Sequence, residues 1–330
     1  MKPHILSKLA ILLGASLLAA PALPKQSAGN PVQPPPHTQP IPNLSIGQTR
    51  EERRESFELA PQLQRAMAPR DLLAQRRRLD DALGQLQPQR PGTVDAYVMT
   101  IALDSDPVFA REAREAARVL ARRYDGVGRT LTLAGPDGAR DDLPRGSIDT
   151  LLISLARIAE IMDPQEDVLV LYTTSHGLKL GLAYHYGDEG YGVLSPAHLK
   201  QALAELGIER RLLILSACYS GVFVPQLASP DTAILTAAAD NRTSFGCRAE
   251  NDWTFFGDAL INRALREPQS LSDAAQQAGR TVAGWESSQG LLASLPQTAI
   301  GADAGQWLDP LEARMPTTAT KQVGRPAVEQ

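Results

Sequence analysis

Residues 168–177 (VLVLYTTSHG) and 212–221 (LLILSACYSG) decide the fold of this 330-residue chain. Each stretch opens with a nearly continuous apolar run, which is typical of a strand buried on both faces in a parallel sheet. Each run leads into a reactive side chain, His176 in the first and Cys218 in the second. Reactive residues of open parallel sheets gather at the carboxyl ends of the strands. We therefore expect His176 and Cys218 to face each other at one sheet edge.

From residue 94 onward, strand patterns alternate with helix patterns. Further strands are expected at residues 94–101, 130–133 and 233–236, and helices at residues 107–124, 147–162, 196–206, 253–266 and 270–286. Such alternation predicts a mostly parallel sheet covered by helices on both faces. The predicted fold class is α/β, a three-layer α/β/α sandwich with a mostly parallel central sheet.

The N-terminal end has the pattern of an export signal. Lys2 and Lys8 accompany an uncharged apolar run at residues 9–20, and Ala20-Pro21-Ala22 supplies small residues for cleavage after Ala22. We expect residues 1–22 to be a signal peptide and the protein to be exported, either periplasmic or secreted. The run is shorter than the roughly 20 residues of a membrane span, so no stable span is expected after signal removal. An uncleaved N-terminal anchor is the alternative.

Composition divides the remaining chain into segments. Residues 23–47 are rich in proline and are expected to form a disordered spacer. Residues 48–92 are highly charged with a narrow apolar stripe, which predicts a helical arm lying on the domain. A pro-segment or a partner-binding arm is the alternative for this stretch. The predicted domain spans residues 93–290, and residues 291–330 are expected to form an extension that is largely a loose tail.

Charge and residue counts exclude several classes of function. The chain has 33 basic against 37 acidic residues and a net charge of −4, which argues against a nucleic-acid partner. Two cysteines exclude a disulfide-stapled scaffold and a Cys-rich zinc module. The five histidines include no pair at HExxH spacing, which excludes a zincin. We expect no cofactor and no metal, while the oligomeric state stays open.

The pairing of Cys218 with His176 has a clear chemical use. A thiol becomes a strong nucleophile when an adjacent imidazole takes its proton. Gly177 leaves room for a substrate backbone, and nearby backbone N–H groups can stabilise an oxyanion. A serine nucleophile is a weaker alternative, because the chain has no G-x-S-x-G elbow.

The two motifs, Thr174-Ser175-His176-Gly177 and Ser216-Ala217-Cys218-Tyr219-Ser220-Gly221, resemble those of the legumain-type cysteine peptidases. That family comprises asparaginyl endopeptidases, or haemoglobinases, and the catalytic subunit of glycosylphosphatidylinositol transamidase. The resemblance implies a caspase-like fold and endopeptidase activity on a protein or peptide substrate, through a Cys218/His176 dyad. It also implies that the backbone N–H groups of Gly177 and Cys218 hold the oxyanion.

The resemblance extends over about residues 94–266. Residues 236–247 (TAAADNRTSFGC) and 256–258 (FGD) look like family segments that form the pocket for the residue before the scissile bond. The resemblance implies that this substrate pocket involves Arg111, Ser216, Ser244 and Asp258. Ser216 stands where plant and animal members have Glu, so one pocket carboxylate is missing. Asn and Asp are both candidates for the preferred substrate residue, since an amide or a carboxylate would suit such a pocket.

Two other functions share these motifs. Peptide ligation or transamidation would use the same dyad, with an amine resolving the thioester in place of water. A silent caspase-like scaffold would instead work through its charged arm.

A disulfide between Cys218 and Cys247 is a further alternative in an exported protein. Four other groups are expected to have ordinary roles: His37 in the spacer, His185 in a surface hairpin, and Asp104 and Asp106 as loop and helix-cap residues.

Overall fold

The computed structural model describes residues 33–34, 37–40, 42–59 and 61–328, all within the unit formed by residues 31–330. Its central sheet has six strands in the order β10-β9-β8-β4-β2-β3. Neighbouring strands are parallel except at one edge, where β10 is antiparallel to β9. The strands are β2 (Ala96–Ala102), β3 (Thr130–Leu133), β4 (Val168–Thr174), β8 (Arg211–Ser216), β9 (Thr232–Thr236) and β10 (Gln297–Ile300). The predicted signal peptide, residues 1–22, lies outside the described residues.

Side chains of the central strands alternate between two hydrophobic clusters. In β2, Tyr97 and Met99 pack into one cluster, whereas Ala96 and Val98 pack into the other. Successive side chains of a strand point to opposite faces of the sheet. Burial on both faces explains why the sequences of β4 and β8 are nearly uninterrupted apolar runs.

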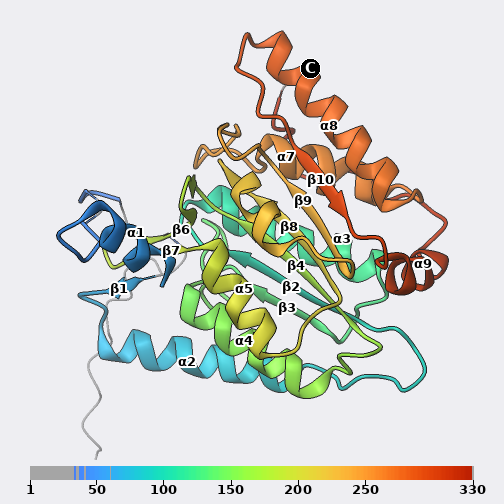
Figure 1. Ribbon diagram of the computed structural model, residues 1–330, viewed down its shortest axis with the longest axis horizontal. Helices are drawn as coiled ribbons and strands as arrows, with labels where there is room; N and C mark the ends of the chain where they lie inside the picture. The colour runs from blue at the N-terminus through green and yellow to red at the C-terminus, as the bar shows by residue number, and fades with distance from the viewer. Residues whose placement is uncertain (1–32, 35–36, 41, 60, 329–330) are drawn as a thin grey trace, which may run out of the picture. The chain divides into compact units, whose positions relative to one another are not determined.

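Helices cover both faces of this sheet (Figure 1). The first cluster, which holds Ala96 and Val98, contains residues of α3 (Pro107–Arg123), α8 (Leu271–Ser288), and the irregular succession α7 (Phe255–Gly257), η2 (Asp258–Arg263) and η3 (Ala264–Arg266). The second contains residues of α2 (Pro69–Gly84), α4 (Ile148–Ile161), α5 (Pro196–Glu205), η1 (Ser220–Phe223) and α6 (Val224–Leu227). The predicted three-layer α/β/α class is confirmed.

A second, antiparallel sheet follows directly after His176. Its strand order is β1-β7-β6-β5, and its strands are β1 (Gln62–Gln64), β5 (Gly177–Leu178), β6 (Gly181–Tyr186) and β7 (Gly190–Leu194). The stretch around His185 forms a hairpin, as expected. The expected surface position of His185 is wrong, because its side chain is largely buried. The His185 side chain is only 12% exposed, because His37 and Tyr191 stack against its two sides.

The loose tail expected from residue 291 is wrong for much of that segment. Residues 297–300 form β10 on the edge of the main sheet, and α9 (Gly305–Ala313) buries Trp307, Leu308 and Leu311. Few apolar residues anchor this segment, and Pro310 lies inside the helix, so its sequence pattern resembles a tail. The Trp307 indole N–H donates to the carbonyl of Asp231 at 3.0 Å.

The predicted arm, residues 48–92, comprises α1 (Arg50–Glu58), β1 and α2. Leu79 and Leu83 of α2 are buried in the second cluster, and β1 pairs with β7 of the second sheet. The arm is therefore packed on the domain at two places. Among the described residues, no helix combines the length and apolar character needed to cross a membrane.

Candidate active site

His176 and Cys218 follow two neighbouring strands at matching positions. β4 and β8 pair in parallel up to Thr174 opposite Ser216, and each reactive residue comes two positions later. The N–H of Ser175 donates to the carbonyl of Ser216 at 3.2 Å, which extends the pairing beyond the regular strands. The two loops therefore leave the sheet side by side, as the apolar runs predicted.

Gly177 packs directly on the backbone of Cys218. A Cβ atom at position 177 would lie 1.9 Å from the Cys218 carbonyl oxygen and 3.0 Å from its nitrogen. Real Cβ atoms do not approach backbone atoms so closely, so only glycine fits here. This contact fixes the loop that carries His176 against the loop that carries Cys218.

The loop around Cys218 places this partly exposed residue beside Ser244. The N–H of Ser244 points at Cys218 Sγ at 3.3 Å, so the predicted Ser244 does lie beside the thiol. Within the described part of the chain, the Cys218 N–H donates to no other group. Tyr219 has φ +57°, a left-handed conformation that costs a non-glycine residue about 1–2 kcal/mol. Such strain is typical of functional turns.

The imidazole ring of His176 contacts the carboxylate of Asp106. Its Nε2 lies 3.6 Å from Asp106 Oδ2, and the edge of the Phe109 ring meets the imidazole at a centroid distance of 5.1 Å. Burial alone lowers the pKa of His176. The hydrogen bond that its ring donates to Asp106, together with the charges of Asp104 and Asp106, raises the pKa above its ordinary value. The contact at Nε2 leaves Nδ1 as the nitrogen available to a thiol.

Asp106 occupies the N-cap position of α3, as expected. It precedes α3 but makes no side-chain cap hydrogen bond, and it faces His176 instead. Asp104 has its side chain fully buried, and its Oδ1 accepts the Asp106 N–H at 2.9 Å, which fixes the loop. No sequence signal links Asp106 to His176, because they lie on separate strand–helix units.

The other predicted pocket residues are engaged by the protein itself. Arg111 donates to the carbonyls of Asp137 and Ala249 at 3.1 and 2.6 Å, and pairs with Asp252 at 3.2 Å. Asp258 is buried, and accepts hydrogen bonds from Asn262 at 2.8 Å and from the backbone of Ala327 at 2.8 Å. Arg111 thus anchors the segment that follows Cys247, whereas the structure turns Asp258 toward the C-terminal segment.

A buried carboxylate lies beside Ser216, that of Glu112, which sequence reasoning did not single out. Glu112 is fully buried, and its carboxylate accepts hydrogen bonds from Ser216 Oγ at 3.1 Å, Thr174 Oγ1 at 2.8 Å and the N–H of Thr254 at 2.7 Å. Burial raises its pKa despite these donors. Ser216 is itself buried and faces this network. The carboxylate comes from α3 rather than from β8.

Cys218 and Cys247 are both free thiols, so the alternative disulfide is not formed. Cys247 packs against the small cluster around Phe109, and burial raises its pKa far above its ordinary value. A thiol in this environment stays protonated, so its role is that of a small apolar side chain.

In the part of the chain that the structure describes, two groups of side chains have donor atoms within metal-binding reach of one another. They are His37, Asp104 and His185, and Asp104, Asp106 and His176. In the first group the rings of His37 and His185 are stacked, with centroids 3.8 Å apart and planes 27° apart. Stacked rings direct their in-plane lone pairs side by side, which does not suit two ligands of one tetrahedral ion.

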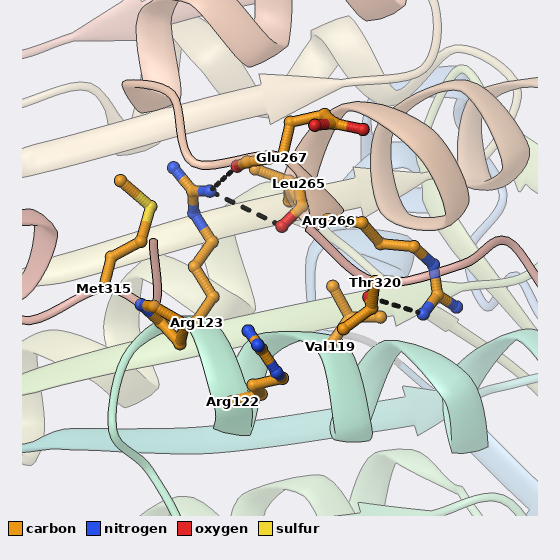
Figure 2. A pocket seen from close by; sticks show the side chains of 9 residues that line it. Val119, Arg122, Arg123, Leu265, Arg266, Glu267, Met315 and Thr320 are labelled. Carbon is orange, nitrogen blue, oxygen red and sulfur yellow. Dashed lines mark hydrogen bonds between the residues drawn. The ribbon is translucent and has the colours of Figure 1, made fainter. Parts of the chain in front are cut away.

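A cavity elsewhere in the fold has no place in this chemistry. Figure 2 shows it between α3 and the C-terminal segment, with Arg123 donating to the carbonyls of Leu265 and Glu267 at 3.4 and 3.1 Å. Its volume of about 10 Å³ holds no more than a water molecule. Arg123 therefore connects α3 to residues 265–267.

The substitution Gly177→Ala tests the contact between the two loops. The added Cβ meets backbone that no rotamer change can move, so we expect a loss of about 1–3 kcal/mol in the free energy of unfolding. We also expect at least tenfold slower alkylation of Cys218. Urea denaturation and iodoacetamide labelling measure the two effects. Gly279→Ala in α8 is the matched control, since its Cβ meets nothing within 4 Å. Wild-type values for Gly177→Ala would contradict the packing.

Comparisons with known proteins found one family and similar solved structures. A model of the Peptidase C13 family matches residues 151–306, the stretch that contains both motifs. A crystal structure of caspase-1 from Spodoptera frugiperda is similar to this chain, with 16% identity and a TM-score of 0.43. The match covers 65% of this chain and 88% of the caspase chain. No curated protein sequence matches. The family match confirms, over residues 151–306, the resemblance carried by the two motifs to the cysteine peptidases of the legumain type.

Proposed function

We propose that this peptidase is an exported endopeptidase that cleaves peptide bonds with Cys218 as nucleophile and His176 as its proton partner. The observation that carries the proposal is the contact of Gly177 with the Cys218 backbone, since it keeps the two loops together. The unoccupied N–H of Cys218, judged over the described residues, supports an oxyanion site at the same position.

The proposed reaction follows from these positions. His176 takes the thiol proton, and Cys218 Sγ attacks the carbonyl carbon of the scissile bond. The oxyanion accepts hydrogen bonds from the N–H groups of Cys218 and, by family resemblance, Gly177. His176 then protonates the leaving amine, and a thioester remains on Cys218. Water, activated by His176, hydrolyses the thioester and frees the carboxyl product.

Asp106 has a defined part in this proposal as a positioning residue. Its carboxylate meets Nε2 of His176, which orients the ring and stabilises the imidazolium that forms when the thiol is deprotonated. A carboxylate stabilises the charged ring more than a neutral amide would.

For specificity we propose that the residue before the scissile bond is Asn or Asp. Ser244 supports a polar pocket, because its hydroxyl and carbonyl oxygens each lie 3.6 Å from the thiol. An amide or carboxylate side chain can accept a hydrogen bond from the Ser244 hydroxyl. Arg111 donates to loop carbonyls and pairs with Asp252, so its part in the pocket rests on the family resemblance.

Thiol labelling tests the proposed dyad directly. Fast iodoacetamide alkylation at mildly acidic and neutral pH, confined to Cys218, is expected for wild type. His176→Ala should slow it at least tenfold, because the thiolate loses its counter-ion. Peptide mapping identifies the labelled cysteine, and buried Cys247 serves as an internal control. Labelling that is indifferent to His176 would refute the dyad.

Asp106→Asn tests the positioning role. Removing the negative charge takes away a contribution that raises the His176 pKa, so the pKa should fall. NMR titration of His176 in Cys218→Ala and in Cys218→Ala/Asp106→Asn measures this. In the active enzyme, the high-pH limb of the kcat/KM profile should move to lower pH, because the imidazolium that protonates the leaving amine is lost earlier. Asp106→Glu should restore part of the shift. An unmoved His176 pKa would leave Asp106 with a structural role only.

Export is supported by the N-terminal pattern of Lys2, Lys8, the apolar run at residues 9–20 and the Ala20-Pro21-Ala22 site. We expect the mature protein to begin at Leu23 and to be periplasmic or secreted. N-terminal sequencing of protein recovered from each cell fraction checks this. Full-length protein confined to the membrane fraction would favour an uncleaved anchor.

A further inference from the structure

A short N-terminal segment lies against the site. We call Gln33, Pro34 and residues 37–40 the N-terminal strap; they belong to the stretch expected to be a disordered spacer. The strap contacts the domain near both of its ends. The Gln33 side-chain amide donates to the carbonyl of Gly138 at 3.4 Å, and the strap meets Asp188 beyond His37. The composition argument missed these contacts because they are polar and need no apolar core.

Asp188 binds the strap backbone. One of its carboxylate oxygens accepts the N–H groups of Thr38 and Gln39 at 2.9 and 2.7 Å, and the Thr38 hydroxyl donates to the other oxygen. One carboxylate oxygen that accepts two successive N–H groups binds the main chain rather than the side chains, here at the bend at Gln39. Asp188 lies in the β6–β7 turn of the second sheet, where Arg65 donates to its carbonyl at 3.2 Å.

His37 fills a defined place between the strap and the loop before α3. Its ring stacks on His185 at 3.8 Å, and its Nε2 lies 3.0 Å from Ser105 Oγ. Its Nδ1 lies 3.9 Å from Asp106 Oδ1, while the other oxygen of Asp106 contacts His176. One carboxylate therefore separates the strap from the proposed proton partner.

The opposite end of the strap reaches the neighbourhood of Arg111. Gly138, which accepts from Gln33, lies so close that a Cβ there would be 3.7 Å from Arg111 Nη1. The described residues of the strap thus contact Gly138 near Arg111, Asp106 and Asp188. These are the surroundings in which a substrate of the proposed peptidase would have to lie.

We propose that the surface made by Gly138, Ser105, His185 and Asp188 is a groove that binds the main chain of a peptide, and that the strap occupies it in competition with substrate. This inference rests on the proposed function, because it names the substrate subsites and the regulation of that same site. A tethered segment has an effective local concentration in the millimolar range, so even weak contacts keep the groove filled. Release or removal of the strap opens the groove to a substrate chain.

The test loosens the strap within the full-length protein. His37→Ala/Thr38→Pro removes the stacked ring and one backbone donor, in a segment that already tolerates proline. Asn43→Ala/Ser45→Ala is the matched control, since the side-chain hydrogen bonds of those residues stay within their own turn. A fluorescent peptide of residues 31–44 is titrated against both forms in a Cys218→Ala background, and anisotropy reports its binding.

We expect at least tenfold tighter peptide binding to the loosened form than to the control, and at least a tenfold loss when Asp188→Ala is added. Equal binding to both forms, or binding indifferent to Asp188, would overturn the groove. With Cys218 intact, the loosened form should cleave a peptide substrate with at least fivefold higher kcat/KM. Unchanged kcat/KM would overturn the competition. If the peptide binds as expected but the protein with Cys218 intact cleaves no peptide, the proposed function is refuted and the groove is still supported.

Discussion

The close packing of Gly177 on the backbone of Cys218 is the contact on which the site depends. Parallel pairing of β4 with β8 brings the two loops to the same edge, but pairing alone does not set their separation. The missing side chain at position 177 allows backbone to meet backbone. The left-handed turn at Tyr219 then directs the chain away after Cys218. The reactive side chains are consequently placed by main-chain geometry, which side-chain motion disturbs little.

The start of α3 organises the charges around that contact. Asp106 immediately before the helix faces His176, and Glu112 in its second turn lies beneath Ser216 and Thr174. One carboxylate is near the surface and stabilises a positive ring, while the other is buried and collects hydrogen bonds from β4, β8 and the start of α7. The helix therefore links the ends of both reactive strands.

Sequence patterns predicted the parts of the fold that depend on burial. The continuous apolar runs of β4 and β8 indicated central strands, and the reactive residues beyond them indicated the sheet edge. The β6–β7 hairpin was predicted only as a polar surface turn, because its tyrosines and His185 do not read as core residues. The contact between Asp106 and His176, and the strap on Asp188, join segments far apart in the chain through single polar contacts. Periodicity carries no signal for such contacts.

The central claim is that Cys218 and His176 form a working peptidase site. Incubation of the purified protein with a degenerate peptide library, followed by mass spectrometry of the products, tests it most directly. The account predicts new carboxyl termini at Asn or Asp, formed by wild type and by neither Cys218→Ala nor His176→Ala. Joined peptides in place of cleaved ones would identify a ligase with the same dyad. Cleavage that persists in Cys218→Ala, or its absence from a wild type shown to be folded, would contradict the account.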